Sequence, residues 1–380
     1  MAQTNRLVGE PVRLGKPKIN DDLLVIQGKP DRYNVLTSPA IGSTMQVFGA
    51  QGDLKSMAAR SNRHPTMHGK TIKYGEKGNW RKVSFSRGDN ICTLEIDDIT
   101  KLSGYNKSVK KIFAFALVKT NEQAYSDGVF RQNYITFPLK ELLEVGVYKN
   151  IRAARAGYED AMRALTSLKF SGKISQGKKA AATQAKIEVL FTGAEISNGE
   201  CKIYLNERIN WQYVAPFYTM IPAFYFALPT KAADLLFYVF YLARQNQEKI
   251  RDNGYFNINN RSIAQFLGLP DEGEAKNPSR DIRQRIEEAI EGIEKKILTS
   301  GEKGALMLTP CNGEGTTIKD YLDNGYLKVE IAGSYAPFFI NGANQKTRSI
   351  EAARRKKEKI IEAAKIKNLA ESMKQQQDEK

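Results

Sequence analysis

The stretch 134-YITFPLKELLEVGVYKNIRAARAGYEDAMRALTSL-168 decides the fold of this chain. It begins with a short apolar run, Tyr134–Phe137, and continues with a short helical pattern that ends near Gly146. The spacing then predicts a long amphipathic helix from about Asn150 to Phe170, because its apolar residues recur every three or four positions. These residues are Ile151, Ala154, Tyr158, Ala161, Leu165 and Leu168. A hairpin rich in glycine and lysine follows the helix.

The same order of elements returns in the second half of the chain. The stretch 255-YFNINNRSIAQFLGL-269 contains an apolar run and a short helix that stops at Gly268. A second long helix is predicted over Pro278–Ile297, and a glycine-rich hairpin again follows. Helix, turn, helix and β-hairpin is the order of the winged helix-turn-helix, whose second helix enters the major groove of DNA. The sequence therefore predicts an α+β fold with two tandem winged-helix domains.

Weaker patterns extend this organisation to the rest of the chain. Residues 1–85 are rich in Gly, Pro, Asn, Lys and Arg, which predicts a mostly flexible N-terminal arm with a few small strands. Ordered structure is expected from the alternating run Ile91–Ile96, followed by a first helix over Ser108–Glu122. The aromatic segment Trp211–Leu228 is expected to join the two domains, and the helix Lys231–Gln247 then begins the second. The predicted divisions are 1–85 for the arm, 86–210 and 211–335 for the two domains, and 336–380 for a basic helical tail.

The charge of the chain limits its partners. Its 58 Lys and Arg residues exceed its 42 Asp and Glu residues, which gives a formal net charge of +16. Such a balance favours nucleic acid or an anionic membrane surface as partner. No apolar stretch approaches the roughly 20 residues that span a bilayer, and the N-terminus carries no signal-peptide core. We therefore expect a cytoplasmic protein that binds nucleic acid and has no membrane partner.

The first long helix carries the first set of candidate DNA contacts. A basic row lies beside its apolar stripe, and the lysine-rich turn Ser171–Ala180 is predicted to be the wing tip, with Ala185–Phe191 and Cys201–Leu205 as the following strands. A charged row beside an apolar one is most often only a solvated helix face. Its place as the third helix of the unit favours DNA, since an arginine fork can bind guanine or phosphate through two hydrogen bonds. The candidates are Lys149, Asn150, Arg152, Arg155 and Arg163 on the helix, with Lys173, Lys178 and Lys179 on the wing.

The second long helix separates its charges along its length. It opens on Asn277-Pro278, a residue that caps well followed by proline at the first helical position. Arginines crowd the first turns and glutamates the later ones, which suits a helix whose N-terminal end meets DNA. Pairing of these arginines with Glu287 or Glu288 is the alternative. The candidates are Ser279, Arg280, Arg283, Gln284 and Arg285, with Lys303 on a second wing that extends through a Gly/Asn-rich segment, Cys311–Thr317, to the closing strand Tyr326–Ile331.

No residue pattern points to catalysis. His64 and His68 are the only histidines, and the proline after His64 and the lack of neighbouring ligands argue against a metal site. The phosphate-loop, nucleophile-elbow and zinc-hydrolase patterns are absent. Cys92, Cys201 and Cys311 lie far apart and form no CxxC pair, which predicts buried or free thiols. We therefore expect a protein that is not an enzyme and holds no cofactor or metal.

The stretch Tyr134–Leu168 resembles the first winged-helix domain of the iteron-binding plasmid replication initiators, the Rep family. Lys231–Ile297 is similar to their second winged helix, with a long helix, the segment SIAQFLGL and then RDIRQRIEEAIEGIEKKI. The resemblance covers about Ile91 to Ile331 and rests on apolar spacing rather than on invariant residues. The length of the arm and the insertion in the second wing depart from the family pattern.

The resemblance implies a function in bacteria. Both domains would bind one DNA repeat, with contacts from the helices that begin near Asn150 and Asn277 and from their wings. Monomers would assemble on direct repeats at a plasmid origin, help open A·T-rich DNA and recruit the host helicase and initiator. Dimers joined through the first domain would bind an inverted repeat and repress the initiator's own gene.

The expected function is therefore sequence-specific binding of duplex DNA to initiate replication of a plasmid or mobile element. A transcriptional regulator of a phage or conjugative element, built from the same parts, is the first alternative. An RNA-binding or single-strand-binding protein is the second, with the aromatic residues of Trp211–Phe226 stacked on bases. Core packing is the favoured interpretation of that segment, because few basic residues lie between its aromatics. A nicking enzyme would need a nucleophilic tyrosine beside a metal.

Overall fold

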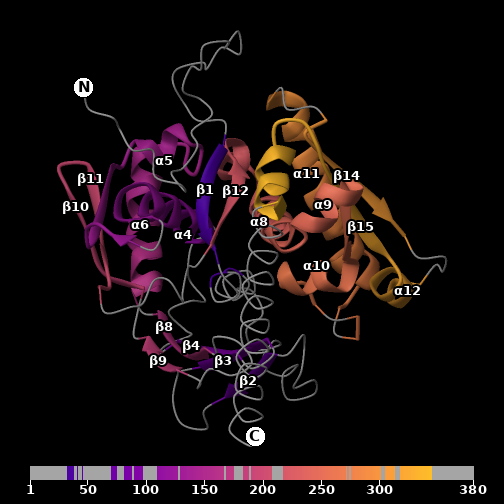
Figure 1. The fold of residues 1–380 in the computed structure, drawn as a ribbon, viewed down its shortest axis with the longest axis horizontal. Helices are drawn as coiled ribbons and strands as arrows, with labels where there is room; N and C mark the ends of the chain where they lie inside the picture. The colour runs from indigo at the N-terminus through magenta and orange to yellow at the C-terminus, as the bar shows by residue number, and fades with distance from the viewer. Residues whose placement is uncertain are drawn as a thin grey trace, which may run out of the picture.

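Figure 1 shows the course of the chain in a computed structural model of residues 1–380. Backbone and side chains are described for residues 32–37, 41, 45, 109–125, 129–166, 190–207, 218–270, 272–273, 275–300, 304–312 and 317–344. The backbone alone is described for 70–74, 81–87, 90–96, 126, 168–174, 183–187 and 217. The described chain consists of helices and small antiparallel sheets, which is the mixed α+β class that the sequence predicts.

The first unit begins with a helix and ends with a hairpin. Helix α4 (Val109–Lys119) leads through the π-helical turn η2 (Thr120–Ala124) and the short strands β5 (Tyr125–Ser126) and β6 (Val129–Phe130) to strand β7 (Tyr134–Pro138). Helices α5 (Glu141–Glu144) and α6 (Ile151–Thr166) come next, and then the strands β10 (Phe191–Ser197) and β11 (Glu200–Leu205). The sheet has the order β10-β11-β7, so β7, its first strand in the sequence, pairs with β11, its last.

Local sequence explains how α5 ends and how α6 is held. Gly146 follows α5 with a φ of +89°, a left-handed conformation that favours glycine. In α6 the predicted apolar stripe is buried, including Ala154, Tyr158 and Leu165. The ring of Tyr158 lies edge-on to Phe137 of β7, with 6.0 Å between the ring centres. Helix α6 is thereby anchored on the sheet, and its opposite face is left to solvent.

The second unit repeats the plan of the first. Its elements are α8 (Thr230–Gln245), α9 (Gln247–Asn253), β13 (Tyr255–Asn259), α10 (Asn260–Phe266), the π-helical turn η4 (Ser279–Gln284), α11 (Arg285–Ser300), β14 (Leu306–Cys311), α12 (Ile318–Asp323) and β15 (Tyr326–Ile331). The sheet order β13-β15-β14 again pairs the first strand with the last. Helix α12 is an addition, because it stands between the two strands that form a simple hairpin in the first unit.

One pair of side chains shows how closely the two sheets correspond. Lys202 of β11 lies opposite Thr136, the middle residue of β7. Lys328 of β15 lies opposite Asn257, the middle residue of β13. Each ammonium lies over the tyrosine that begins that strand, with Nζ 4.6 Å from the ring centre of Tyr134 and 4.7 Å from that of Tyr255. The shared cation–π pair and the shared sheet order indicate one folding plan used twice.

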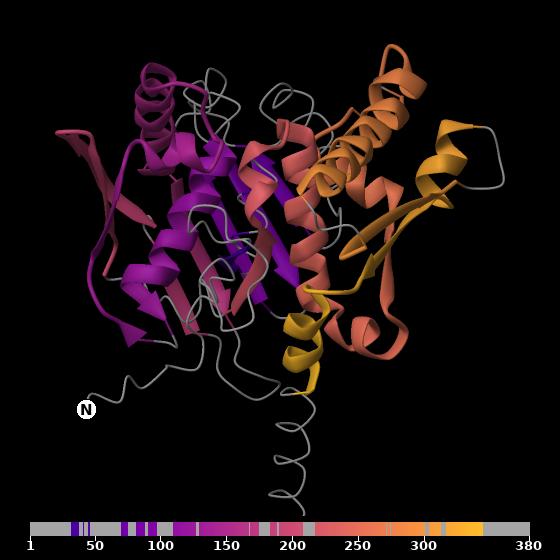
Figure 2. The same cartoon turned by 90° about the horizontal axis from the view of Figure 1, so that it is seen from above.

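A two-stranded ribbon lies between the two units (Figures 1 and 2). Strand β1 (Arg32–Thr37) pairs with β12 (Phe217–Pro222), which leads through the 3-10 helix η3 (Ala223–Ala227) into α8. On one side β1 packs against α4, and on the other β12 packs against α8. Val35 and Leu36 are fully or almost fully buried there. The ribbon therefore belongs to a core that both units share.

Two lysines of α4 complete this joint. Lys110 Nζ lies 2.8 Å from Asp234 Oδ2 of α8, and both side chains are only 3–4% exposed. Lys111 donates hydrogen bonds to the backbone oxygens of Phe226, at 2.8 Å, and Leu228. Burial lowers the pKa of Lys110 in spite of its partner, and it lowers the pKa of Lys111 to about 8. Buried polar groups in this joint keep their partners only when the two units hold one relative position.

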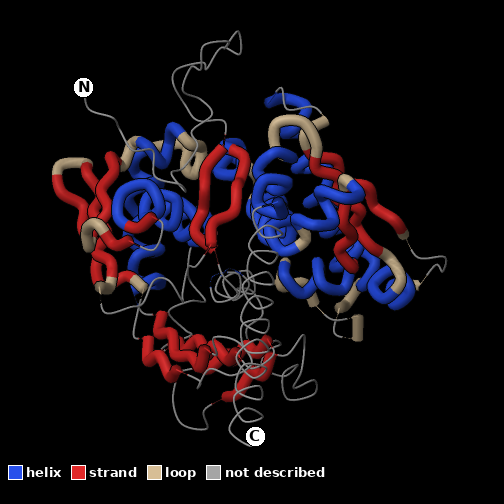
Figure 3. The backbone as a smooth tube through the Cα atoms, viewed as in Figure 1, coloured by secondary structure: helices blue, strands red, loops and turns tan. Residues whose placement is uncertain are grey.

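A third sheet of five strands lies below both units in Figure 3. Its order is β2-β3-β4-β8-β9, and all neighbours are antiparallel. The strands are β2 (Lys70–Tyr74), β3 (Arg81–Arg87), β4 (Asn90–Ile96), β8 (Leu168–Ile174) and β9 (Thr183–Ile187). The β8–β9 hairpin is an insertion between α6 and β10, and it joins strands that precede the first unit in the sequence.

This third sheet changes the predicted wing of the first unit. Helix α6 ends at Thr166 instead of near Phe170, because Leu168–Ile174 alternates between apolar and polar residues and pairs with β4. The described part of the predicted wing tip, Ser171–Ile174, and the start of its returning strand, Ala185–Ile187, therefore belong to the third sheet. The hairpin that closes the first unit is β10–β11, and its second strand, predicted over Cys201–Leu205, is confirmed.

The ends of the chain also differ from the prediction. Arg32–Thr37 falls in the predicted flexible arm but is a buried strand, since its apolar residues fill the joint. The predicted basic helical tail begins at residue 336, and the chain is helical from Ala336 to Asn344. This part is packed into the core instead of being solvated, because Phe339 is buried with its ring centre 6.1 Å from that of Phe240. The basic group Arg354–Lys357 of the predicted tail lies outside the described residues.

Candidate nucleic-acid interface

The first long helix begins with an exposed basic turn. Asn150 caps α6, because its Oδ1 accepts a hydrogen bond from the backbone N–H of Ala153 at 2.9 Å. Lys149 and Arg152 stand on either side of the cap and are exposed. Within the described part of the chain, neither side chain has an ion-pair or hydrogen-bond partner. Free backbone N–H groups and the helix dipole favour an anion at this end, and the two exposed cations add positive charge there.

Farther along α6 the arginines have only weak partners. Arg155 Nε is 4.0 Å from Glu159 Oε1, and Arg163 Nη1 is 3.8 Å from Asp160 Oδ1. The two arginine side chains are 61% and 72% exposed, and exposed pairs contribute only about 0–1 kcal/mol. Both guanidinium groups can therefore exchange these partners for a phosphate or a base edge at little cost.

The second long helix begins with the same kind of cap. Asn277 Oδ1 accepts from the backbone N–H of Arg280 at 3.2 Å, and Asp281 Oδ2 accepts from the backbone N–H of Asn277 at 3.0 Å. The hydrogen bond from Asn277 is the main cause that lowers the pKa of Asp281. The predicted helix start at Asn277-Pro278 is thus confirmed, and its first turns are π-helical.

A basic residue absent from the sequence prediction stands at this second cap. Lys276 is exposed and directly precedes Asn277, as Lys149 precedes Asn150. The repeated Lys-Asn dipeptide is visible in the sequence, but it gains meaning only when both asparagines are seen to cap equivalent helices.

The arginines of the second helix differ from those of the first in their partners. Arg283 Nε is 2.8 Å from Glu287 Oε1, and Arg285 Nη1 is 3.0 Å from Glu288 Oε2. Further pairs join Arg280 to Asp281 at 3.2 Å and Gln284 Nε2 to Glu288 Oε1 at 3.0 Å. The alternative considered from sequence, pairing within the helix, is what the structure shows. Ser279 is exposed at the start of η4.

The added helix α12 lies beside this end of the second helix and contacts η4. The ring of Tyr321 lies under the guanidinium of Arg283, with 5.3 Å from Cζ to the ring centre. Arg283 is therefore held by Glu287 on one side and by an aromatic ring on the other, and burial together with Glu287 raises the pKa of Tyr321 to about 12. Of the five polar candidates on η4 and the start of α11, Ser279, Arg280, Gln284 and Arg285 remain exposed.

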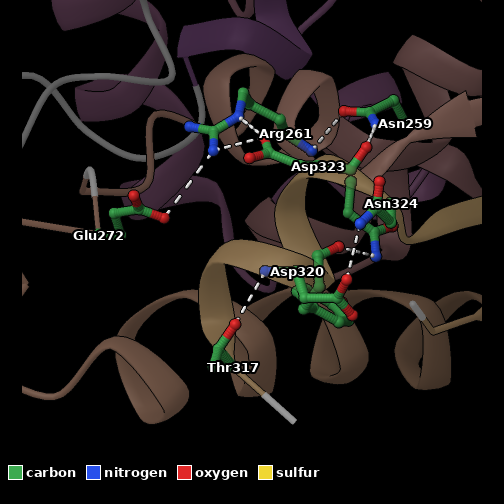
Figure 4. A network of polar contacts seen from close by, with 9 residues as sticks. Asn259, Arg261, Glu272, Thr317, Asp320, Asp323 and Asn324 are labelled. Carbon is green, nitrogen blue, oxygen red and sulfur yellow. Dashed lines mark hydrogen bonds and ion pairs between the residues drawn. The ribbon is translucent and has the colours of Figure 1, made fainter. Parts of the chain in front are cut away.

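A polar network holds α12 in place (Figure 4). Arg261 of α10 donates to Asp323 Oδ1 at 2.6 Å and lies 3.8 Å from Glu272. Asn259 Nδ2 donates to the backbone oxygen of Asp323 at 3.0 Å, and the buried Asn260 Nδ2 donates to that of Tyr321 at 3.0 Å. Within α12, Thr317 caps the helix by accepting from the Asp320 N–H, and Asn324 donates to the Asp320 carboxylate.

Of the four contact residues predicted on the wings, the structure describes only the backbone of one. Lys173 is on β8 in the third sheet, and its backbone alone is described. Lys178, Lys179 and Lys303 fall outside the described residues. The structure therefore brings together the helix candidates of each unit, and it describes no side chain of the predicted wing residues.

The described residues offer little to other chemistry. Among them there is no group of three His, Cys, Asp or Glu side chains that could hold a metal ion. Cys201 and Cys311 are free thiols, and burial raises the pKa of Cys201 to about 12, which makes it a poor nucleophile. No described helix is both long and apolar enough to cross a membrane.

Comparisons with known proteins give distant likenesses. No protein-family model matches the chain, and no curated protein matches it in sequence. A crystal structure of RctB domains 2–3 is similar with a TM-score of 0.38 and 11% identity, over 70% of this chain and 94% of that chain. A second, of selenomethionine derivatives of RctB domains 2 and 3, has a TM-score of 0.37 and 9% identity, over 68% and 94%. These values are too low to support an inference, so the function must follow from this chain's own residues.

Proposed function

We propose that this protein binds specific sequences of duplex DNA through two tandem winged-helix domains. The observation that carries this proposal is the doubled unit, in which each long helix opens on an exposed Lys-Asn turn followed by arginines. A winged helix is expected to consist of a helix, a strand, two helices and a hairpin, in that order. The first strand of its sheet then pairs with the last, as in both units of this protein. The net charge of +16 supplies long-range attraction to DNA.

The two helices are suited to unequal shares of the contact. Lys149 and Arg152 have no described protein partner, and Arg155 has only a long and exposed one. Arg283 and Arg285 must first give up close pairs with glutamates of their own helix. The free energy that these arginines gain from a contact with DNA is reduced by the loss of their ion pairs with the glutamates. Helix α6 therefore contributes more than α11 to recognition of the DNA sequence.

The joint between the units supports binding of both helices to one DNA site. The buried Lys110–Asp234 pair and the shared core favour one relative position of α6 and α11. Two readers at constant spacing bind a site of defined length, because the second contact needs no further ordering of the protein. This property suits a protein that recognises one repeat with both domains.

Initiation of replication is the further part of the proposal, and it rests on the resemblance to iteron-binding plasmid initiators. In this function monomers bind direct repeats at an origin and recruit the host helicase and initiator, and dimers repress the protein's own gene. The protein acts in the bacterial cytoplasm by binding and remodelling DNA, without bond chemistry. Regulation of a phage or conjugative promoter is the alternative that uses the same domains.

A nuclease footprint across the DNA that flanks the protein's own gene tests this function. Protection of several direct repeats, spaced by about one helical turn or its multiples beside an A·T-rich tract, supports the initiator. Protection of a single inverted repeat over a promoter supports the regulator instead. Binding without a discrete footprint would contradict sequence-specific recognition in either form.

The assignment of α6 is tested by Arg152→Ala with Arg155→Ala. Each lost base contact should cost about 1–3 kcal/mol of binding free energy to the protected site and relax its sequence preference. Arg131→Ala with Lys249→Ala is the matched control, because both residues are exposed and lie outside the two long helices. Arg283→Ala with Arg285→Ala should have a smaller effect than the α6 variant. Unchanged affinity and preference in the α6 variant would contradict its role as reader.

A further inference from the structure

The third sheet sorts its residues onto two different faces. Directly opposed residues of antiparallel strands share a face, and successive residues alternate between faces. By this register one face carries most of the apolar residues, among them Ile72, Val83, Phe85, Leu94, Phe170 and Ile187, together with the basic residues Lys70, Arg81 and Arg87. The other face, named the lysine face, is defined by Lys73, Lys82, Lys169, Lys173 and Lys186. Glu95 is the one acidic residue that the described strands place on it.

Protection of sheet edges does not account for this face. Lysine is common on edge strands, where it discourages pairing with another chain. That reason applies to Lys73 on β2 and Lys186 on β9, which are the outer strands. Lys82, Lys169 and Lys173 lie on β3 and β8, which have neighbours on both sides. Three of the five lysines therefore need another explanation.

The arrangement of charges is unfavourable for the sheet by itself. Lys73 lies directly opposite Lys82, and like charges in opposed positions destabilise a sheet. Glu95 is paired in register with Lys82 on one side and with Lys169 on the other, so this face has one acidic position for its five lysines. The face retains an excess of four positive charges over the described strands. An external polyanion would relieve this repulsion.

The residue types on the lysine face favour the phosphate backbone of duplex DNA as its ligand, over single strands and base edges. Proteins that hold single strands stack bases on aromatic side chains, but the register places Tyr74, Phe85 and Phe170 on the apolar face. Base readout is most often the work of arginine, and the register places Arg81 and Arg87 on the apolar face as well. Lysines interspersed with Ser and Thr can hold phosphates without reading the sequence.

We infer that the lysine face is a separate binding surface for the phosphate backbone of duplex DNA. The inference rests on the proposed DNA-binding function but not on its sequence specificity. In this view α6 and α11 select the site, and the third sheet holds DNA next to it. Lys173, predicted as a wing contact, then meets phosphate from this sheet.

The test is the affinity of the full chain for a labelled duplex of unrelated sequence, measured over a range of salt. The variant Lys82→Gln, Lys169→Gln, Lys173→Gln should bind at least about tenfold more weakly at low salt. Its slope of log affinity against log salt should fall by about 0.9 per lost phosphate contact, or about 2.7 for three. Arg131→Gln, Lys140→Gln, Lys249→Gln removes the same charge from exposed positions outside the two long helices and the third sheet, and it should leave the slope close to that of the parent.

Two further measurements separate charge from folding. The variant Lys82→Arg, Lys169→Arg, Lys173→Arg keeps the charge and should keep the affinity. In the unaltered protein, added duplex should protect these three lysines from acetylation, as mass spectrometry measures it. The inference is overturned if the Gln variant binds with an unchanged slope, if duplex gives no protection, or if a single strand protects the lysines better than duplex.

These outcomes are independent of those for the proposed function. A footprint without discrete sites would contradict sequence-specific recognition, and the salt slope of the Gln variant would still decide the lysine face. Conversely, a Gln variant with parental affinity and slope would remove the lysine face and leave the footprint unaffected. The ratio of affinities for the protected site and an unrelated duplex should stay constant in the Gln variant.

Discussion

Replacing Asp234 by leucine would leave the ammonium of Lys110 in the joint between the units without its carboxylate. In the native joint the charged atoms lie 2.8 Å apart, and at an effective dielectric constant of about 20 their attraction is about 6 kcal/mol. This attraction is offset by a desolvation cost of several kcal/mol for each ion. The variant loses the attraction and keeps the cost of the buried ammonium.

Release of a proton by Lys110 limits the loss of stability in this variant. A lysine in an unfolded chain has a pKa of about 10.4, so keeping it neutral costs about 4.6 kcal/mol at pH 7 and about 1.9 kcal/mol at pH 9. We expect Asp234→Leu to lower the free energy of unfolding by about 3–5 kcal/mol at pH 7 and by about 2 kcal/mol or less at pH 9. The sign follows because the unfolded variant binds one more proton than the folded one, so its stability rises with pH relative to the parent.

Urea unfolding followed by circular dichroism at both pH values measures this difference. The control is Lys110→Met combined with Asp234→Leu, which removes both charges and should be close to the parent in stability at either pH. A cost below about 1 kcal/mol at pH 7 would refute the argument, since a buried and unpaired ammonium must cost more. A cost that stays constant between pH 7 and pH 9 would refute it as well.

Two further predictions concern the joint and α12. The parent protein should gain up to about 2–3 kcal/mol of unfolding free energy between pH 8 and pH 10, because the pKa of Lys111 is about 8 when folded and about 10.4 when unfolded. Urea titrations should show most of this rise vanishing in Lys111→Met, and a flat parental profile would contradict it. Gly325→Ala should lower stability by about 1–3 kcal/mol, because the added methyl would overlap the carbonyl oxygen of Tyr321 and the amide of Asn260. Gly273→Ala, with open space around it, is the control in thermal unfolding, and equal melting temperatures would argue against the tight contact of α12.

The helices of both units could be predicted because their signals are local. The apolar stripe of α6, the glycine after α5 and the asparagine that begins each long helix all act within a few residues. The closing strand Tyr326–Ile331 was predicted with the bounds that the structure shows, since its alternation is clear. Where a pattern and the contact it makes lie in one segment, the sequence is sufficient to predict the element.

The candidate site could be predicted only in part. The basic positions on both helices follow from spacing, but whether an arginine is free depends on its neighbours in space. Arg283 illustrates this, because Glu287 lies one turn away on its own helix while Tyr321 comes from an inserted helix far along the chain. The pairing with Glu287 could be considered from sequence, and the ring of Tyr321 could not.

The sequence by itself determined the doubled plan of helices and hairpins, the excess of positive charge and the start of both long helices. Only the tertiary structure decided which hairpin closes the first unit, that Arg32–Thr37 is a strand of the shared core, and that Lys110 is buried against Asp234. The physical reason is that periodicity specifies which face of an element is apolar but not its partner. Pairs such as Ile91 with Lys173 join distant segments, and their choice depends on the packing of the whole chain.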